Sequence, residues 1–561
     1  MKYSKRYLAL TVILLIAFAA KLNTWNDEYA DVAAFRGAQL QDDVFYPLKA
    51  RSVNEEGLLR LTVGEQTYGV QDGVILGDHM TVLVSLDFAQ QMFGCSAHLY
   101  QEDMILVDYN GETYRFYIAS TDAQRGDKSI RLSSMPELHD SRAYLPLEDL
   151  CREFGCEYYW DDVNYQASIT EGYQTGSLPS KYDLREKERT AAIRNQGSNS
   201  TCWAQAALGA LESSLLPEEQ FTFDDNHMIE ENAFAIDSSL GGNYTMAVAY
   251  LLSWMGPVAE DDTTVEKHVQ EVHFYGQDDI DAIKWAVYQN GGVSTSIYAN
   301  VTTSNLSKSS YYNRKKNSYC YLGDEKPNHD VVIIGWDDNY RAENFSSEVP
   351  GDGAFICQNS WGATFGEQGV FYVSYYDTNI GEQAVSYAKV EETDNYDSIY
   401  QSDLCGWVGK VGYNKEKIHA ANVYEAQTDE QIVSAGFYAL GKDTEYQVYM
   451  VPDYKSQASL ANRVEVAGGT LSDAGYYTIA FDTPYTVEQG ERFAIVVVLS
   501  TPGSSHPMAI EYPSDGLTEH VDISDGEGYI SNNGLDWESV EEKAGGNLCI
   551  KAYGRHIQPE E

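Results

Sequence analysis

Hydrophobic and polar positions follow three different patterns along the chain, and the first of them is a repeat. Residues 84–95 and 145–156 carry the same succession of apolar residues at helical spacing, and both copies end in Gly-Cys. Each copy predicts a short helix that stops at its glycine, and residues 104–107 after the first copy predict a strand. We therefore expect a repeated α+β module over residues 52–170.

The second pattern, in the centre of the chain, combines a long helix with buried strands. Residues 202–212 are rich in strong helix formers, and Ser and Thr residues just before them are suited to cap that helix. The apolar runs at 331–334 and 354–357 predict buried strands. This α+β region is separated from the repeat by residues 171–180, whose Gly, Ser and Pro content is typical of a linker.

The third pattern begins after residue 389, where short apolar runs alternate with turns rich in Gly, Asn and Asp. The clearest runs are residues 432–440, 447–451 and 493–498. Regularly spaced short strands with many tyrosines predict an all-β sandwich. Three folded domains are therefore expected, at 52–170, 178–390 and 395–556, which agrees with a length of 561 residues.

The first twenty residues have the composition of an export signal. Lys2, Lys5 and Arg6 precede an apolar run over residues 7–20, and small residues lie near its end. Fourteen apolar residues are short for a bilayer, which needs about 20, so a signal peptide at 1–20 is favoured over an uncleaved anchor. We expect a secreted or cell-surface protein without a membrane segment after signal removal.

Charge and cysteine content narrow the picture further. The formal net charge is −47, and so acidic a chain repels phosphate backbones, which argues against nucleic acid as a partner. Eight cysteines in 561 residues do not form a dense disulfide framework. Cys95 and Cys156 end equivalent helices and could bridge, but small buried thiols are the favoured interpretation.

Three separated segments carry the chemistry. The first contains Cys202 at the start of the expected helix, the second contains His329 before a buried strand, and the third contains Asn359 after another strand. A free thiol, with a pKa of about 8.5, is a poor nucleophile near neutral pH, and both a histidine and a helix N-terminus favour its thiolate. An asparagine amide can accept from the imidazole and fix its orientation.

These segments resemble the papain-like cysteine peptidases over residues 180–390. Gln196 and Cys202-Trp203-Ala204 come first, Asn328-His329 follows, and Asn-Ser-Trp-Gly at 359–362 comes last, which is the family's order. His329 lies 127 residues after Cys202, close to the family spacing. The resemblance implies a domain with a helical lobe and a β-barrel-like lobe. It makes Cys202 the nucleophile, His329 the base, Asn359 its orienting group and Gln196 an oxyanion donor.

The same resemblance implies where the substrate lies. Gly241 and Gly242 match the glycines that let an extended peptide backbone approach the enzyme wall, and Trp361 matches the indole that shields the imidazole. Asp330 stands beside the second specificity pocket, where the family often has a small residue. We hypothesise that Asp330 favours basic side chains there, against the alternative of a solvated acid. The family needs no metal or organic cofactor.

Two departures from the family pattern concern the loop before the nucleophile. Asn199 replaces the cysteine that forms a local disulfide in the family, and Ser200 replaces a glycine. The second change bears on the geometry of the oxyanion loop.

The flanking regions carry resemblances of their own. The repeat at 52–170 is similar to the N-terminal module of some copper amine oxidases, but without a His cluster of ligand spacing it does not imply copper binding. Residues 395–403 and the strands after them resemble the lectin-like domain of bacterial papain-like peptidases. The domain's name does not by itself establish a carbohydrate or cell-surface ligand, and that partner stays open.

The sequence thus predicts an exported cysteine endopeptidase that cleaves proteins or peptides through an acyl-enzyme intermediate. Two alternatives stay open. One is a surface adhesin with a peptidase-fold scaffold, although a scaffold has no need for the complete set of Cys202, His329, Asn359 and Gln196. The other is a cell-wall peptide hydrolase or acyl transferase, which would use the same residues with a different acceptor.

Overall fold

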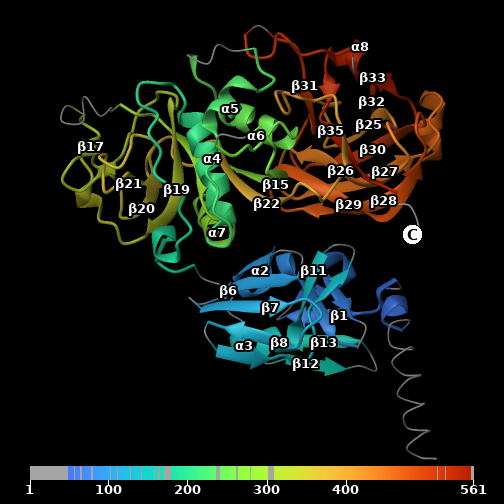
Figure 1. Cartoon of the computed structure of the whole chain (residues 1–561), viewed down its shortest axis with the longest axis horizontal. Helices are drawn as coiled ribbons and strands as arrows, with labels where there is room; N and C mark the ends of the chain where they lie inside the picture. The colour runs from blue at the N-terminus through green and yellow to red at the C-terminus, as the bar shows by residue number, and fades with distance from the viewer. Residues whose placement is uncertain are drawn as a thin grey trace, which may run out of the picture. The chain divides into compact units, whose positions relative to one another are not determined.

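A computed structural model of the protein describes most of residues 49–557, and the chain forms two compact units that divide between residues 177 and 178 (Figure 1). The expected signal peptide and residues 171–177 of the expected linker lie outside the described residues. No helix among the described residues is both long and apolar enough to cross a bilayer. The description leaves out residues 56, 64–65, 78–79, 101–102, 110–111, 127, 140–141, 157, 162–164, 170–177, 236–239, 261–262, 278, 301–308, 515 and 525.

The N-terminal unit contains the two predicted repeat helices, α2 (Leu86–Phe93) and α3 (Leu147–Phe154). Each helix ends at a glycine with left-handed backbone, Gly94 or Gly155, where a side chain would be strained. The first residues of each repeat belong instead to strands, β4 (Val82–Ser85) and β11 (Arg142–Pro146), which pair antiparallel. Both helices contribute to one core, so the two copies fold as a single body.

This unit contains two four-stranded sheets and a five-stranded sheet in which β5 to β9 follow one another in order. All cysteines among the described residues are free, so Cys95 and Cys156 do not form a disulfide. Cys95 Sγ lies 3.4 Å from the Ala89 carbonyl oxygen. The Cys156 thiol hydrogen-bonds the Cys151 thiol instead. The other strands are β1 (Arg60–Val63), β2 (Gln66–Tyr68), β3 (Val74–Leu76), β5 (Ser96–Tyr100), β6 (Met104–Tyr109), β7 (Glu112–Tyr117), β8 (Asp122–Arg125), β9 (Lys128–Arg131), β10 (Glu137–His139), β12 (Tyr158–Asp161) and β13 (Gln166–Ile169).

The second unit begins with a helical part packed against a β part, as the α+β pattern predicts. Helix α4 (Cys202–Leu215) lies between them and packs against β19 (His329–Asp337), β16 (Val293–Ile297) and β22 (Ala384–Glu392) (Figure 1). The remaining elements are α5 (Asp225–Glu230), α6 (Tyr244–Leu252), α7 (Ile280–Asn290), β14 (Lys181–Asp183), β15 (Lys267–Tyr275), β17 (Tyr312–Asn313), β18 (Ser318–Tyr319), β20 (Ala354–Gln358) and β21 (Val370–Ser374).

The C-terminal part of the second unit is the predicted sandwich. Strands of two sheets, among them β25 (Lys417–Glu425) and β26 (Glu430–Ala439), bury their facing side chains in one core. The other elements are β23 (Ser398–Tyr400), β24 (Gly409–Val411), β27 (Thr444–Val451), β28 (Val464–Leu471), β29 (Ala474–Val487), β30 (Arg492–Ser500), β31 (Met508–Glu511), β32 (Gly528–Ser531), β33 (Glu538–Ser539), α8 (Val540–Ala544), β34 (Asn547–Leu548) and β35 (Ile550–His556).

One sheet runs through both parts of the second unit. Strand β15 pairs with β22 on one side and with β29 of the sandwich on the other, over the register Glu271 to Tyr477 through Phe274 to Ala474. This pairing was not predicted, because a hydrophobic pattern identifies a strand but not its partner.

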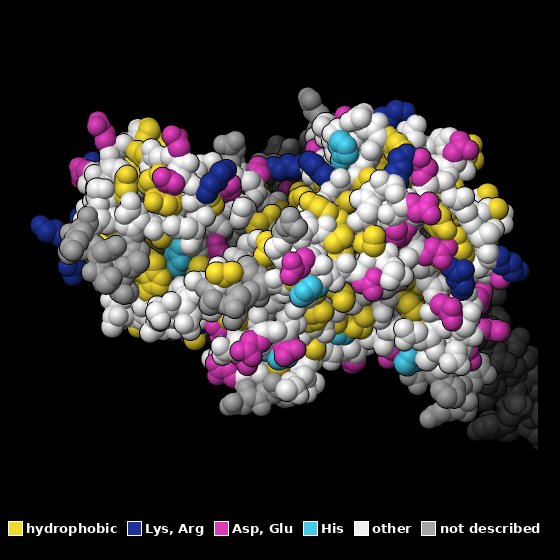
Figure 2. Space-filling view, turned by 90° about the horizontal axis from the view of Figure 1, so that it is seen from above, with side chains coloured by type: hydrophobic (Ala, Val, Ile, Leu, Met, Phe, Trp, Pro, Cys, Tyr) yellow, Lys and Arg dark blue, Asp and Glu magenta, His cyan; other side chains and the backbone are white. Residues whose placement is uncertain are grey.

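On the face seen in Figure 2, acidic side chains are scattered over the surface and not gathered in one patch.

Candidate active site

Helix α4 starts with Cys202 and is buried along most of its length. Its Ala and Leu residues favour a helix and join the core, whereas Cys202 is half-buried at the first turn. The N–H groups at a helix start favour a nearby anion, which is the charge of a thiolate. The capping prediction is wrong, because Thr201 at the N-cap makes no side-chain hydrogen bond to the helix. Thr201 therefore does not occupy the first-turn N–H groups near the thiol.

His329 and Asn359 meet where two neighbouring strands end. His329 opens β19, Asn359 follows β20, and the two strands pair antiparallel. The distance between His329 Nε2 and Asn359 Oδ1 is 2.8 Å, and both residues are buried. Asn359 Oδ1 also accepts from the Ser360 N–H at 2.8 Å, so its oxygen faces the imidazole in a fixed orientation. With Nε2–H donating to Asn359, the other ring nitrogen is left for the thiol.

Trp361 covers this pair. Its ring stacks on the His329 ring with centroids 4.7 Å apart and an angle of 26° between the planes. Trp361 is itself held by a bridge to Asn195 and by edge contact with Phe365. The indole excludes water from one face of the imidazole, which strengthens the buried hydrogen bond to Asn359.

Burial dominates the electrostatics of the thiol and the imidazole. Burial and the Asp330 carboxylate raise the pKa of Cys202 to about 11, against hydrogen bonds from the backbone N–H groups of Asp330, Trp203 and Cys202, which lower it. Burial lowers the pKa of His329 to about 4, against its bond to Asn359. Burial thus disfavours either charge alone. A thiolate forms here most readily when its proton moves to the imidazole, which creates two opposite charges that stabilise each other.

Gln196 lies in the loop before α4 and is fixed by Ser360. Its backbone N–H donates to the Ser360 carbonyl at 2.8 Å, and its side-chain oxygen accepts from Ser360 Oγ at 2.6 Å. Its Nε2 donates one proton to the Asn199 carbonyl at 2.7 Å. One N–H of the amide remains to donate elsewhere. The role of Ser360 escaped the sequence analysis, although the residue lies between Asn359 and Trp361.

Gly241 and Gly242 lie against the segment that carries the thiol. A Cβ atom on Gly242 would come within 2.5 Å of the Trp203 ring. Gly241 has left-handed backbone, and a Cβ there would lie 3.4 Å from Ser200. Both positions therefore require glycine, because the segment approaches Ser200 and Trp203 on either side of Cys202.

A cavity adjoins Cys202 on the side of its neighbours Trp203 and Asp330. Asp330 lies opposite Ser296 in the pairing of β19 with β16, and Ser296 Oγ donates to its carboxylate at 2.6 Å. Burial raises the pKa of Asp330 to about 6, against the effect of that bond. Asp330 is therefore half-buried in a cavity wall and not a fully solvated acid. The lining residues are Trp203, Ala206, Ala207, Tyr244, Ser294, Thr295, Ser296, Asp330, Gln383 and Tyr387.

A buried ionic network that sequence reasoning missed supports the loop before Cys202. Arg194, two residues before Gln196, forms an ion pair with Glu212 of α4, and both side chains are largely buried. Glu212 also accepts from the Phe223 N–H at 2.8 Å, and Arg194 lies 3.5 Å from Asp225. The network links the loop to helix α4, which starts at Cys202. A charged residue inside an Ala- and Leu-rich helix, such as Glu212, was the signal available in the sequence.

Other histidine, basic and cysteine side chains of this part of the chain make different contacts. His227 Nδ1 lies 2.7 Å from the Tyr250 hydroxyl, and residues 314–316 form an exposed turn between β17 and β18. Cys320 and Cys357 are buried free thiols. In the part of the chain that is described, no group of three or more His, Cys, Asp and Glu side chains is placed to hold a metal ion.

Three parts of the chain match known protein families. Residues 178–389 match the papain family cysteine protease model, residues 399–554 match the lectin like domain, and residues 62–169 match the copper amine oxidase N-terminal domain. The chain therefore has a papain-family cysteine peptidase domain with a lectin-like domain after it and a copper amine oxidase N-terminal domain before it.

Two solved structures of a clostridial cysteine protease are each similar to 68% of this chain. The clostridial cysteine protease Cwp84 after propeptide cleavage matches with 25% identity and a TM-score of 0.59, over 68% of this chain and 100% of that one. A structure of the cysteine protease and lectin-like domains of Cwp84, a surface layer associated protein of Clostridium difficile, matches with 24% identity and a TM-score of 0.59, over 68% and 90% of the two chains.

Curated relatives match the peptidase region. A cysteine protease of Blomia tropicalis is 25% identical over 244 residues, which cover 38% of this chain and 66% of the relative. Cathepsin S of Mus musculus is 26% identical over 216 residues, which cover 35% and 59%. The chain thus spans about three fifths of the length of these relatives.

Proposed function

We propose that this chain is a cysteine endopeptidase that hydrolyses peptide bonds with Cys202 as its nucleophile. The observation that supports this best is the buried 2.8 Å bond between His329 and Asn359, covered by Trp361, beside the helix that starts at Cys202. A binding scaffold gains nothing from a buried imidazole oriented in this way, because leaving polar groups desolvated is costly. A nucleophile and base oriented by a third group are what acyl transfer requires.

In the proposed reaction the thiol proton of Cys202 moves to His329, and the sulfur attacks the carbonyl carbon of the peptide. The carbon–nitrogen bond breaks as the imidazolium gives its proton to the leaving amine. Water then attacks the thioester, gives its proton to His329, and releases the acid and the thiol. Asn359 keeps the ring oriented throughout, since its oxygen accepts from Nε2–H.

The negative oxygen of each tetrahedral intermediate needs donors. We assign this role to the Cys202 backbone N–H and to the remaining N–H of Gln196, whose amide is held by Ser360 and Asn199. Two preorganised donors at the developing oxyanion are worth roughly 3 kcal/mol each. Gly241 and Gly242 form the wall along which the peptide backbone lies.

We further propose that Asp330 gives the cavity beside Cys202 a preference for basic side chains. The carboxylate is partly desolvated, so an ammonium or guanidinium group would pair with it more strongly than with a surface acid. With a pKa of about 6, the carboxylate gains its charge as the pH rises through 6, and the preference should grow over the same range. A preference unchanged from pH 5 to pH 7.5 would contradict this role.

The location proposed for the enzyme is outside the cell or on its surface. The basic and apolar N-terminal segment supports export, and the similarity to Cwp84, titled a surface layer associated protein, supports a surface location. Cell fractionation of the native host with an antibody to the peptidase domain tests this. Recovery from the cytosol alone would refute it.

A labelling experiment tests the proposed chemistry directly. The purified protein is treated with an active-site-directed epoxide, the modified cysteine is mapped, and peptide hydrolysis is compared with that of Cys202→Ala. We expect label on Cys202 alone and no hydrolysis by the variant, with Cys357→Ala as a matched control that keeps both properties. Hydrolysis that survives in Cys202→Ala would refute the mechanism, and testing protein substrates beside cell-wall peptides defines the substrate class.

A further inference from the structure

Two thiols meet at the end of helix α3 in the N-terminal unit. Cys151 is 0% exposed in the core of that unit, and Cys156 is half-buried, one residue beyond the glycine that ends the helix. The Cys151 carbonyl accepts from the Cys156 N–H at 2.8 Å, and the Cys151 thiol donates to the Cys156 sulfur. The two residues are therefore in contact through both their backbones and their side chains.

The shape of the turn explains this contact. Gly155 has left-handed backbone (φ 77°), which turns the chain back so that Cys156 lies over the last turn of α3. The backbone bond of 2.8 Å holds the Cα atoms of Cys151 and Cys156 within about 6.7 Å of each other. The Cα atoms of a disulfide lie about 4.4–6.8 Å apart. A disulfide between the two residues therefore needs rotation of their side chains but no other path of the backbone.

The first copy of the repeat makes the same turn without a second thiol. Gly94 ends α2 in the left-handed conformation and Cys95 follows it, but Gln90 stands where the second copy has Cys151. Cys95 is 0% exposed, and its sulfur lies 3.4 Å from the Ala89 carbonyl oxygen. The turn itself does not require two thiols, so the pair in the second copy needs an explanation of its own.

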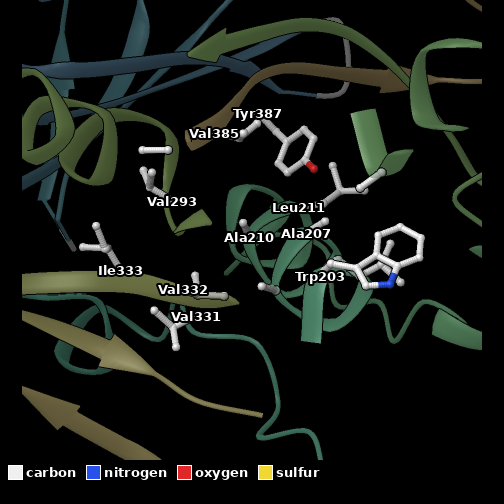
Figure 3. Packing of buried hydrophobic residues seen from close by; sticks show 14 of the residues in the cluster. Trp203, Ala207, Ala210, Leu211, Val293, Val331, Val332, Ile333, Val385 and Tyr387 are labelled. Carbon is white, nitrogen blue, oxygen red and sulfur yellow. The ribbon is translucent and has the colours of Figure 1, made fainter. Parts of the chain in front are cut away.

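Cys156 is the accessible member of the pair. All eight cysteines lie among the described residues, and Cys156 and Cys202 are the two that are not buried. Cys202 belongs to the candidate active site and starts α4, which contributes Trp203 and Ala207 to the hydrophobic cluster of Figure 3. Hydrogen bonding from Cys151 lowers the pKa of Cys156, against the effect of burial, whereas burial raises the pKa of Cys202. Because a thiolate is the form that attacks disulfides, Cys156 is the thiol outside the active site that is best placed to react.

We propose that Cys151 and Cys156 form a redox site, in which a low-molecular-weight disulfide oxidises the two thiols to a disulfide that closes the end of α3. The Cys156 thiolate attacks one sulfur of the small disulfide, whose S–S bond breaks, and the departing half takes up a proton and leaves as a thiol. The Cys151 thiol then gives up its proton, its sulfur attacks the Cys156 sulfur, and the second half leaves as a thiol. Two protein thiols are thereby oxidised, and one small disulfide is reduced to two thiols. The export proposed above would bring the pair into the kind of compartment in which disulfides persist.

The first test uses the full chain with Cys202→Ala, which removes the other half-buried thiol. The reduced protein is incubated with oxidised glutathione, its remaining thiols are alkylated in denaturant, and it is digested with trypsin without reductant. Trypsin cleaves after Arg152, so Cys151 and Cys156 fall on different peptides. We expect these two peptides as a linked pair, two hydrogen atoms lighter than their sum, with Cys95 alkylated. A Cys156 that stays free, stays as a glutathione adduct or bridges to another cysteine would overturn the proposal.

Single variants in the same background separate the roles of the two thiols. Cys151→Ala should stop at the glutathione adduct on Cys156, because no second thiol is left to displace the glutathione. Cys156→Ala should leave Cys151 unmodified, since that thiol is 0% exposed. Cys95→Ala, at the equivalent position of the first repeat, is the matched control and should give the linked pair in unchanged yield. Modification of Cys151 in Cys156→Ala at the rate seen for Cys156 would refute the assigned order of reaction, and the first test holds whether or not these variants fold.

The outcomes are independent of the proposed peptidase activity, because the protein tested lacks Cys202 and the two thiols lie in the N-terminal unit. Absence of the linked pair would refute the redox site and leave the peptidase proposal intact. A linked pair together with no peptide hydrolysis by the wild type would refute the peptidase proposal and leave the redox site.

Discussion

Ser360 and Gln196 offer the sharpest quantitative prediction about catalysis. Ser360 Oγ donates to Gln196 Oε1 at 2.6 Å, and this bond orients the amide whose other end is proposed to hold the oxyanion. Gln196→Ala removes an oxyanion donor and should lower kcat about 10²–10³-fold, or roughly 3 kcal/mol. Ser360→Ala removes only the neutral bond that orients the donor. A bond of this kind is worth about 1 kcal/mol, so kcat should fall about fivefold.

The double variant makes the reasoning refutable. If Ser360 acts through Gln196, then Ser360→Ala in the Gln196→Ala background should produce little further loss, because the donor that it orients is absent. The assay is steady-state hydrolysis of one fluorogenic peptide, with kcat and KM reported separately for all four proteins. The expected change lies in kcat, since the oxyanion exists only after attack has begun. Additive losses, or a loss for Ser360→Ala as large as that for Gln196→Ala, would refute this account.

Three further predictions concern pH, stability and domain coupling. Burial lowers the pKa of His329 to about 4, so the imidazole stays available as a base down to that pH. The acid limb of the pH profile of kcat/KM should therefore lie near pH 4, and an acid limb above pH 6 would contradict this. Arg194→Met leaves Glu212 buried without its ion pair and should lower the unfolding free energy by about 3–5 kcal/mol in urea titrations, whereas Arg341→Met at an exposed ion pair should have little effect. A chain ending at residue 394 loses β29, which leaves one edge of β15 without its partner strand. Unpaired strand edges promote association, so this chain should elute from a size-exclusion column as an oligomer. A stable monomer with full activity would show that β29 is dispensable.

Much of the site was predictable because its residues sit in short, recognisable surroundings. Cys202 starts an Ala- and Leu-rich helix, and His329 and Asn359 each adjoin an apolar run that became a strand. Such local patterns depend on side-chain periodicity and helix propensity, which a sequence displays directly. The prediction failed locally at the Thr201 cap, because the Thr201 backbone (φ −108°, ψ 11°) is not in the extended conformation that a capping side chain needs.

Contacts between segments far apart in the chain could not be predicted from the sequence. Ser360 on Gln196, Glu212 on Arg194 and β29 on β15 join residues far apart in the chain, and a single sequence contains no measure of their proximity. Their energies also depend on burial: an exposed ion pair is nearly neutral, whereas breaking a buried one is costly.

The sequence by itself determined which segments form helices and which form strands, and the order of the three hydrophobic patterns along the chain. It also determined the candidate nucleophile, base and orienting amide. The tertiary structure alone decided that β15 joins the two parts of the second unit and that a cavity lined by Trp203 and Asp330 adjoins Cys202. It alone revealed the buried, unpartnered hydroxyl of Tyr387 among the described residues. The physical reason is that periodicity acts between neighbours along the chain, whereas desolvation and hydrogen-bond pairing are properties of the packed interior.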